Sequence, residues 1–228
     1  MKRTKLMVRL DGAIARRSLL EHPFYQDWQL GTLGRGRLRL YAAQYYRHVE
    51  AFPVHLRVLA RRADDALREI VYENLAEEEN PQAPHPKLWR DFAAAVGVNV
   101  EVLWMSATLP RTRALVETYR EICREKSPVE AVAALYAYEA QVPEIAAIKM
   151  DGLARHYGVN TPEGLAYFKV HEKADRVHRA AWRNWLEEAG RTTVDTSDDA
   201  SEDQVVATAE TALDALWGAL DGIQEVHF

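Results

Sequence analysis

The sequence predicts an all-α protein, a single bundle of about seven helices. Apolar residues recur at three- and four-residue spacing along almost the whole chain, while alternation over a strand's length with β-branched residues is absent. The 228 residues suit one domain with a sizeable core. Since no internal repeat, heptad pattern or long linker divides them, we expect one helical domain spanning residues 1–228.

Prolines and glycines divide the first half of the chain into helices. A first amphipathic segment, 6–22, stops at Pro23, and a long helix contains Pro53, which we expect to kink it. Asp64 is a good cap for the helix that ends at Glu79, before a proline-rich break. The other helices of this half are expected over 24–30, 37–62, 64–79, 87–96, 100–106 and 111–126.

The second half begins with a strong helix start. Ser127 is a cap, a proline occupies the first helical position, and Glu130 completes a capping box. We expect a kink at Pro143. The polar residues 191–203 predict a loop. The helices of this half are expected over 128–157, 162–190 and 204–222.

The composition argues against several classes of function. A net charge of −5 and a pI near 5.9 provide no basic field for binding nucleic acid. No apolar run approaches the roughly 18 residues of a membrane span, and no apolar stretch of signal-peptide length follows the basic N-terminus. The lone Cys123 fits a reducing compartment. We therefore expect a cytoplasmic protein with no nucleic-acid or membrane partner.

The strongest chemical motif is His171-x-x-x-Asp175-x-x-His178, inside a predicted helix. At about 100° per residue, the two imidazoles and the carboxylate project from one face over two turns. The motif alone is equally typical of a polar helix face with an Asp–His ion pair. Its interpretation therefore depends on other candidate ligands.

Three further residues supply such ligands. Glu78 lies near a helix end, His85 follows across the proline-rich break, and Glu139 lies among small apolar residues, where an unpaired carboxylate is costly. Together with the motif they form a set of mixed carboxylates and imidazoles that suits two iron or manganese ions with open positions for oxygen. Fe/Fe and Fe/Mn pairs both accept this set.

Each of the three also has a structural interpretation. Glu78 belongs to an acidic run that is typical of a solvated helix end, and His85 could be a loop residue without a role. Glu139 could pair with Lys149 or an arginine, and Glu144 could replace it as a ligand. Only the conjunction of all six residues favours a metal centre.

Several stretches resemble the heme-oxygenase-like helical family, which includes thiaminase-like and pyrroloquinoline-quinone-synthase-like proteins. They are Glu21-His22-Pro23-Phe24-Tyr25, Tyr45-Tyr46-x-His48-x-x-Ala51-Phe52-Pro53, Asn74-Leu75-x-x-Glu78-Glu79-Asn80, Ala133-Ala134-Leu135-Tyr136-x-Tyr138-Glu139-x-Gln141-x-Pro143 and Phe168-x-x-His171-x-x-x-Asp175-x-x-His178. The resemblance covers residues 19–180 and is greatest to the branch typified by the chlamydia protein associating with death domains. It implies a helical bundle around a dinuclear metal site, whose ligand pattern falls on the same six residues.

The resemblance also implies a reaction. Members of this branch make the para-aminobenzoate moiety of folate and consume one of their own tyrosines as the carbon source, which here corresponds to Tyr25. The family's amine donor corresponds to Lys149, and oxidation could pass through a neighbouring ring such as Tyr41. O₂ and an unidentified external reductant would be co-substrates. The residues alone favour an aromatic core or core-edge position for Tyr25. They also suit a Lys149 whose aliphatic stem lies along an apolar stripe while its amine reaches solvent.

Three other functions stay open at this stage. A dimetal oxidase could act on a diffusible substrate and spare Tyr25, a metal-free thiaminase-like or pyrroloquinoline-quinone-synthase-like protein could bind a small heterocycle, or the bundle could be an interaction module. A homodimer is expected, since it could bury some of the tryptophans Trp104, Trp182, Trp185 and Trp217. We expect His48 to be a neighbour of the site, and we assign no role to His22, His55, His156 and His227.

Overall fold

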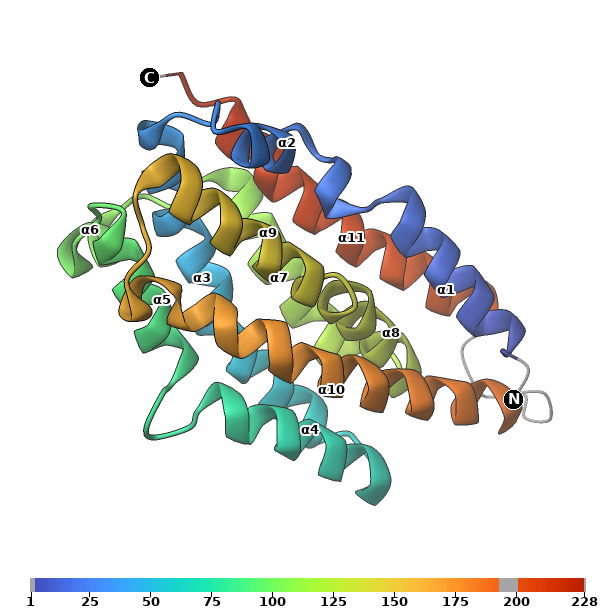
Figure 1. The fold of residues 1–228 in the computed structure, drawn as a ribbon. Coiled ribbons are helices and arrows are strands. Elements are labelled where there is room, and N and C mark those ends of the chain that lie inside the picture. The colour runs from blue at the N-terminus through green and yellow to red at the C-terminus, as the bar shows by residue number, and fades with distance from the viewer. Residues whose placement is uncertain (1–2, 193–200, 228) are drawn as a thin grey trace.

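The computed structural model describes residues 3–192 and 201–227. These residues form a bundle of helices without β-strands (Figure 1), so the all-α prediction is confirmed. The elements are α1 (Lys5–Arg16), a 3₁₀ turn (Leu19–Glu21), α2 (Pro23–Leu30), α3 (Arg35–Ala60), α4 (Asp65–Glu78), α5 (His85–Ala95), α6 (Val100–Met105), α7 (Pro110–Glu125), α8 (Pro128–Glu139), α9 (Val142–Gly152), a π-helical turn (Leu153–Tyr157), α10 (Pro162–Thr192) and α11 (Glu202–Gln224).

The predicted first helix, 6–22, is interrupted in the structure. Helix α1 ends at Arg16, and the backbone N–H of Leu19 donates to the side-chain oxygen of Gln141 at 2.8 Å instead of continuing the helix. The ring of His22 then accepts the backbone N–H of Phe24 at 2.9 Å and caps α2. A tertiary contact therefore ends α1, and His22 has the structural role of a helix cap.

The predicted helix over 128–157 is split rather than kinked. Helix α8 ends at Glu139, and α9 begins at Val142 with Pro143 in its first turn. Pro143 has no backbone N–H to donate to the carbonyl of residue 139, so the helical ladder cannot continue through it. Glu139 and Lys149 therefore lie on two separate helices rather than on one.

Two other predictions concern the continuity and the ends of helices. Helix α3 is continuous through Pro53, and the kink expected there stays a prediction. Within the predicted loop 191–203, α10 extends to Thr192 and α11 begins at Glu202, where Ser201 and Gln204 form a capping box. Residues 193–200 of that loop lie outside the described residues. The capping box predicted at Ser127 and Glu130 is confirmed.

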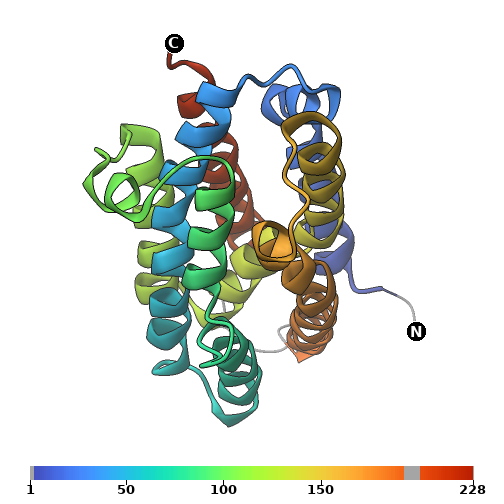
Figure 2. The ribbon, with the colours of Figure 1, turned by 60° about the vertical axis from the view of Figure 1, so that its left-hand side comes forward.

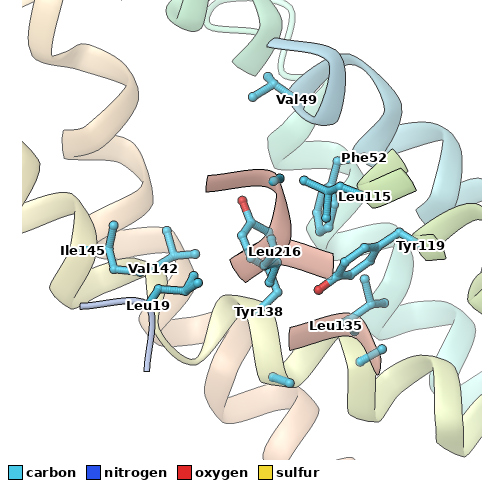
Figure 3. Close-up of a cluster of buried hydrophobic side chains, with 14 of the residues drawn as sticks. Leu19, Val49, Phe52, Leu115, Tyr119, Leu135, Tyr138, Val142, Ile145 and Leu216 are labelled. Atoms are coloured by element: carbon cyan, nitrogen blue, oxygen red, sulfur yellow. The ribbon is translucent and has the colours of Figure 1, made fainter. Parts of the chain in front are cut away.

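The core lies where α3, α7, α8, α9, α10 and α11 meet. Helix α10 packs against α5, α8 and α9, while α11 packs against α7 and α8. Helix α4 lies at the end of the molecule away from the C-terminus in both ribbon views (Figures 1 and 2). Figure 3 shows buried side chains from distant parts of the chain meeting in this core, including Leu19, Phe52, Leu115, Tyr138, Ile145 and Leu216.

Two predictions about partners, the lack of a membrane partner and the homodimer, concern the surface of the molecule. None of the described helices is long and apolar enough to cross a membrane. Trp182 is buried inside the bundle and is therefore not available to an interface, whereas Trp104 on α6 is 58% exposed. The homodimer remains a prediction.

Gly152 provides a test of the close packing between α9 and α2. A Cβ atom at this position would lie 2.6 Å from Cδ1 and 3.1 Å from the backbone oxygen of Trp28. Because Trp28 is fully buried, it has little room to move. We expect Gly152→Ala to lower the free energy of unfolding by about 1–3 kcal/mol in urea denaturation.

Gly218 is the matched control. It lies within α11, and nothing would lie within 4 Å of its added Cβ. Gly218→Ala should leave stability unchanged or raise it by up to about 1 kcal/mol, because alanine is the better helix former. Equal effects of the two substitutions would contradict the proposed close contact.

Candidate metal centre

Six buried side chains from four helices form two groups of candidate metal ligands. In each group, one ligand atom per residue lies within 4.8 Å of the others. The first group is Glu78, His85 and His171, and the second is Glu139, Asp175 and His178. Glu78, His171, Glu139 and Asp175 also line one small cavity, so the two groups adjoin the same space. The structure therefore brings together all six residues that the sequence analysis selected.

Helix ends and one helix face position these side chains. Glu78 ends α4, His85 begins α5 and Glu139 ends α8. Those ends fall at the proline-rich break before residue 85 and at the break before Pro143. The other three residues lie on one face of α10, as the helical period requires.

His171 is held in a defined orientation. Its Nδ1 atom is 2.8 Å from the backbone oxygen of Tyr167, which can only accept a hydrogen bond, so Nδ1 carries the proton. The ring stacks on that of Tyr167 with 4.0 Å between centroids. The unprotonated Nε2 lies 4.0 Å from Oε1 of Glu78. This is the arrangement of an imidazole prepared for a metal ion.

Glu139 receives hydrogen bonds from two neutral donors. Asn74 Nδ2 is 3.0 and 3.2 Å from its two carboxylate oxygens, and Trp182 Nε1 is 2.8 Å from Oε2. Neither Lys149 nor an arginine pairs with Glu139 among the described residues. The sequence analysis gave Asn74 and Trp182 no role. Their spacing could have indicated one, because Asn74 precedes Glu78 by one turn and Trp182 follows His178 by one turn.

Glu144 is not an alternative ligand. Its side chain is exposed and receives hydrogen bonds from Arg179 at 3.2 and 3.3 Å. The break between α8 and α9 turns it away from the cavity. Of Glu139 and Glu144, only Glu139 is therefore a candidate metal ligand.

The polar atoms of the cavity fit a bound cation. Nδ1 of His85 lies 2.9 Å from Oε2 of Glu78 yet makes no hydrogen bond, and Oδ2 of Asp175 is buried without a partner. Burial raises the pKa of Glu139 to about 8 and raises that of Asp175 well above its usual range, while it lowers the pKa of His171. Metal ions would offset these desolvation costs and satisfy the free lone pairs. Mixed nitrogen and oxygen ligation suits iron or manganese.

Lys149 and Tyr25 lie in a second, apolar cavity. Tyr45, Phe168 and His171 also line it, and no carboxylate does. Lys149 Nζ donates to the hydroxyl of Tyr41 at 2.5 Å and lies 5.3 Å from the ring centroid of Tyr25. Burial lowers the pKa of Lys149 to about 7. The amine therefore exists largely in its neutral, nucleophilic form at slightly alkaline pH.

Three aromatic or imidazole residues stand between the two cavities. Tyr138, Tyr167 and His171 line both of them. The hydroxyl of Tyr138 is 2.7 Å from that of Tyr45. Burial raises the pKa of Tyr25 and of Tyr41, so both phenols are neutral. The side chains that separate the candidate metal centre from the cavity of Tyr25 are therefore buried rings.

His48 lies on the wall of the cavity that the two ligand groups share. Its two ring nitrogens are buried without hydrogen-bond partners, and burial lowers its pKa to about 3. The ring contacts Tyr45, Tyr119 and Tyr138 with 5.1–5.4 Å between centroids. It is therefore a neutral neighbour of the site, in the position that the sequence analysis anticipated.

Comparison with known proteins agrees with this geometry. The family model described as iron-containing redox enzyme matches residues 39–217, which contain all six candidate ligands. The chain belongs to this iron-containing redox enzyme family. It is accordingly an oxidoreductase.

Curated relatives of this redox enzyme extend over most of the chain. It is 40% identical over 226 residues to a 4-aminobenzoate synthase of Nitrosomonas europaea, covering 95% of this chain and 89% of the relative. Identity to the 4-aminobenzoate synthase of Chlamydia trachomatis is 37%, covering 93% and 89%. A pyrroloquinoline-quinone synthase of Xanthomonas campestris is 31% identical, covering 65% of this chain and 61% of the relative.

Solved structures share the fold of this redox enzyme. A TenA homologue from Pseudomonas syringae has a TM-score of 0.78 at 19% identity, covering 97% of this chain and 92% of the other. A protein from Nostoc punctiforme described as CADD-like has a TM-score of 0.73 at 19% identity, covering 96% of each chain. These likenesses confirm the heme-oxygenase-like fold.

Asp175 tests the metal centre directly. We expect the purified chain to hold about two iron or manganese ions. Asp175→Asn removes one anionic ligand, so the bound metal should fall to about one ion or less per chain in elemental analysis. Without metal, the variant should be at least as stable as the metal-free unmodified protein, because the desolvation cost of a buried carboxylate has been removed.

Asp151→Asn is the control for this substitution. Asp151 is an exposed residue of α9 that pairs with Arg155 at 2.8 Å. Its loss should leave the metal content unchanged. Full metal content in Asp175→Asn would exclude Asp175 as a ligand.

The burial of Lys149 predicts a specific dependence of stability on pH. Its pKa is about 7 in the folded chain and 10.5 in the ordinary state, so the unfolded chain binds one more proton between these values. Stability due to this group therefore rises with pH across that window, by on the order of 1 kcal/mol per pH unit. Lys149→Met should be more stable than the unmodified protein at pH 7, and the advantage should shrink towards pH 9.5.

The measurement is urea denaturation of both proteins, freed of metal, at several pH values between 7 and 9.5. Taking the difference between them removes the contributions of the other titrating groups. A difference independent of pH would show that the Lys149 amine is not desolvated.

Proposed function

We propose that this chain is a dimetal oxygenase that makes para-aminobenzoate for folate biosynthesis from its own Tyr25, with O₂ and an external reductant as co-substrates. Relatives at 36–40% identity carry the name 4-aminobenzoate synthase. The observation that carries the proposal is the meeting of a buried lysine and a buried tyrosine in a cavity that shares a wall with the candidate metal centre.

Six residues would hold the two metal ions: Glu78, His85, Glu139, His171, Asp175 and His178. When bound, an Fe/Fe or Fe/Mn pair supplies the activation of O₂. Asn74 and Trp182 would hold Glu139 in place, and the carbonyl of Tyr167 would set the protonation of His171. Both kinds of contact keep ligand atoms directed into the cavity.

Tyr25 would provide the carbon of the product. Its ring is 2% exposed and contacts Phe24 edge-on, with 5.3 Å between centroids. This enclosure excludes water and keeps oxidising equivalents away from solvent. Cleavage between Cα and Cβ would release the ring with Cβ, which is oxidised to the carboxylate. Because the chain consumes its own side chain, we expect a single turnover.

Lys149 would provide the nitrogen, and Tyr41 would hold it in position. The amine would condense with the para carbon of the oxidised Tyr25 ring, which loses its oxygen as water. Hydrolysis after oxidation by O₂ would then break the Cε–Nζ bond and leave Lys149 as an aldehyde. The hydrogen bond from Nζ to the hydroxyl of Tyr41 fixes the amine, which lies 5.3 Å from the centroid of Tyr25. Its pKa of about 7 makes the free amine available near neutral pH. Tyr41 also lies beside Phe24, with 4.9 Å between centroids, and is the ring through which we propose that Tyr25 is oxidised.

A second candidate is a dimetal oxidase that acts on a diffusible substrate with the same ligands. The apolar cavity beside Tyr25 favours it, since apolar walls with few polar groups are typical of small-molecule sites. Multiple turnovers with Tyr25 intact would support this candidate. The resemblance to pyrroloquinoline-quinone synthases favours a third, metal-free activity. Finding about two metal ions per chain by elemental analysis would exclude it.

Rescue of a bacterium that requires para-aminobenzoate tests the proposal. The intact gene should restore growth, whereas Tyr25→Phe, Lys149→Ala and His171→Ala should not. Intact-protein mass spectrometry after aerobic reaction of the metal-loaded protein with a reductant should then show a mass loss located at residue 25.

A matched tyrosine serves as the control. Tyr72 on α4 is 53% exposed and lies away from both cavities, so Tyr72→Phe should rescue growth fully. Growth restored by Tyr25→Phe would overturn the self-sacrificing reaction. Growth without the His171 imidazole would overturn the metal centre.

A further inference from the structure

A surface groove between α4 and α10 opens beside the second ligand group, Glu139, Asp175 and His178. Its walls are formed by Ile70, Glu73, Asn74, Ala76, Glu77, Val177, His178, Ala181 and Trp182. Three of these residues connect it to the buried centre: His178 is a candidate ligand, and Asn74 and Trp182 donate hydrogen bonds to Glu139. The groove therefore leads from solvent to the second group.

The groove carries unneutralised negative charge. Glu73 and Glu77 lie one helical turn apart, and within the described residues neither pairs with a lysine or arginine. Two other acids of the same region are neutralised: Asp65 pairs with Arg68 at 2.6 Å, and Glu79 pairs with Arg57. No lysine or arginine lines the groove. Such a groove concentrates cations at its mouth.

Asn74, which lines this groove, carries a buried acceptor atom without a partner among the described residues. Asn74 is 1% exposed, and its Nδ2 is used by Glu139, but its Oδ1 has no hydrogen-bond partner among the described residues. An unsatisfied carbonyl oxygen in such a position is costly unless a ligand occupies it. Carbonyl and carboxylate oxygens together are ligands for hard divalent cations.

His178 links the groove to the second group. Its Nε2 atom lies 3.7 Å from Oε2 of Glu77, which is at the groove. Its Nδ1 atom lies 3.4 Å from Oδ1 of Asp175 and 3.7 Å from Oε2 of Glu139. One imidazole ring thus separates the last exposed carboxylate from the buried ligands.

We propose that divalent metal ions reach the buried centre through this groove, where Glu73, Glu77 and the Oδ1 atom of Asn74 bind the ion transiently before it passes His178. The proposal rests on the dinuclear centre proposed above. It assigns Glu73 and Glu77 to metal uptake rather than to the final coordination. Removing their charges should therefore change the rate of loading and not the amount of metal finally bound.

Glu77 could alternatively orient the ring of His178, as carboxylates often do for metal-binding imidazoles. The two roles differ in what they predict. An orienting carboxylate strengthens the final site, so its loss weakens the affinity and speeds release of the ion. An uptake carboxylate affects loading and release equally, so its loss leaves the dissociation constant unchanged.

The experiment measures Mn²⁺ loading of the full chain after removal of metal by a chelator. Free Mn²⁺ is followed by electron paramagnetic resonance, and its signal disappears on binding. For Glu73→Gln combined with Glu77→Gln, we expect loading slowed on the order of tenfold at low salt, with a smaller effect at high salt. The final number of ions per chain and the dissociation constant should stay within about twofold.

Two further variants separate charge from shape. Val177 lines the groove and is 65% exposed, so Val177→Trp should slow loading by obstruction, at both low and high salt. Glu101→Gln removes one exposed negative charge on α6, away from the groove, and should load like the unmodified chain.

The outcomes decide between the proposals. Normal loading rates in both groove variants, with full final occupancy, would overturn the uptake route and leave the metal centre intact. A weakened dissociation constant with faster release would overturn it in favour of an orienting role for Glu77. Failure of the unmodified chain to bind Mn²⁺ or Fe²⁺ at all would overturn the dinuclear centre and the uptake route with it.

Discussion

The burial of three carboxylates and three imidazoles in one helical core is the constraint on which the rest of this structure depends. Each of these groups loses solvation on folding, and the loss is costly unless the group finds a partner. Neutral donors compensate part of the cost, as Asn74 and Trp182 do for Glu139. The unpartnered oxygen of Asp175 remains, and a bound cation would compensate it. The buried carboxylates of this site therefore favour a bound cation.

The cavity around Lys149 has a different lining. No carboxylate lines it, and rings surround the amine, so burial favours the uncharged form. Tyr138, Tyr167 and His171 separate this cavity from the ligand groups and belong to the walls of both. Burial favours uncharged groups in both cavities, but only the cavity of the ligand groups contains carboxylates that a bound cation could compensate. A shared wall of rings separates the two.

Local sequence rules predicted the parts of the site that lie within one element. The 3.6-residue period put His171, Asp175 and His178 on one face, and the capping box at Ser127 formed as its spacing indicated. Errors arose where a distant residue decides the outcome. Gln141 ends α1 by accepting the backbone N–H of Leu19, which no local pattern in α1 records.

The sequence by itself determined the helical class, the identity of the six candidate ligands and the places where proline ends a helix, because periodicity and proline chemistry act locally. Only the tertiary structure decided that Asn74 and Trp182 hold Glu139, that Glu144 faces Arg179, and that Lys149 lies beside Tyr25 and Tyr41. These relations depend on how α8 and α9 diverge and on which helices pack together. A change in direction at one break moves every later side chain, so such contacts are a property of the assembled bundle.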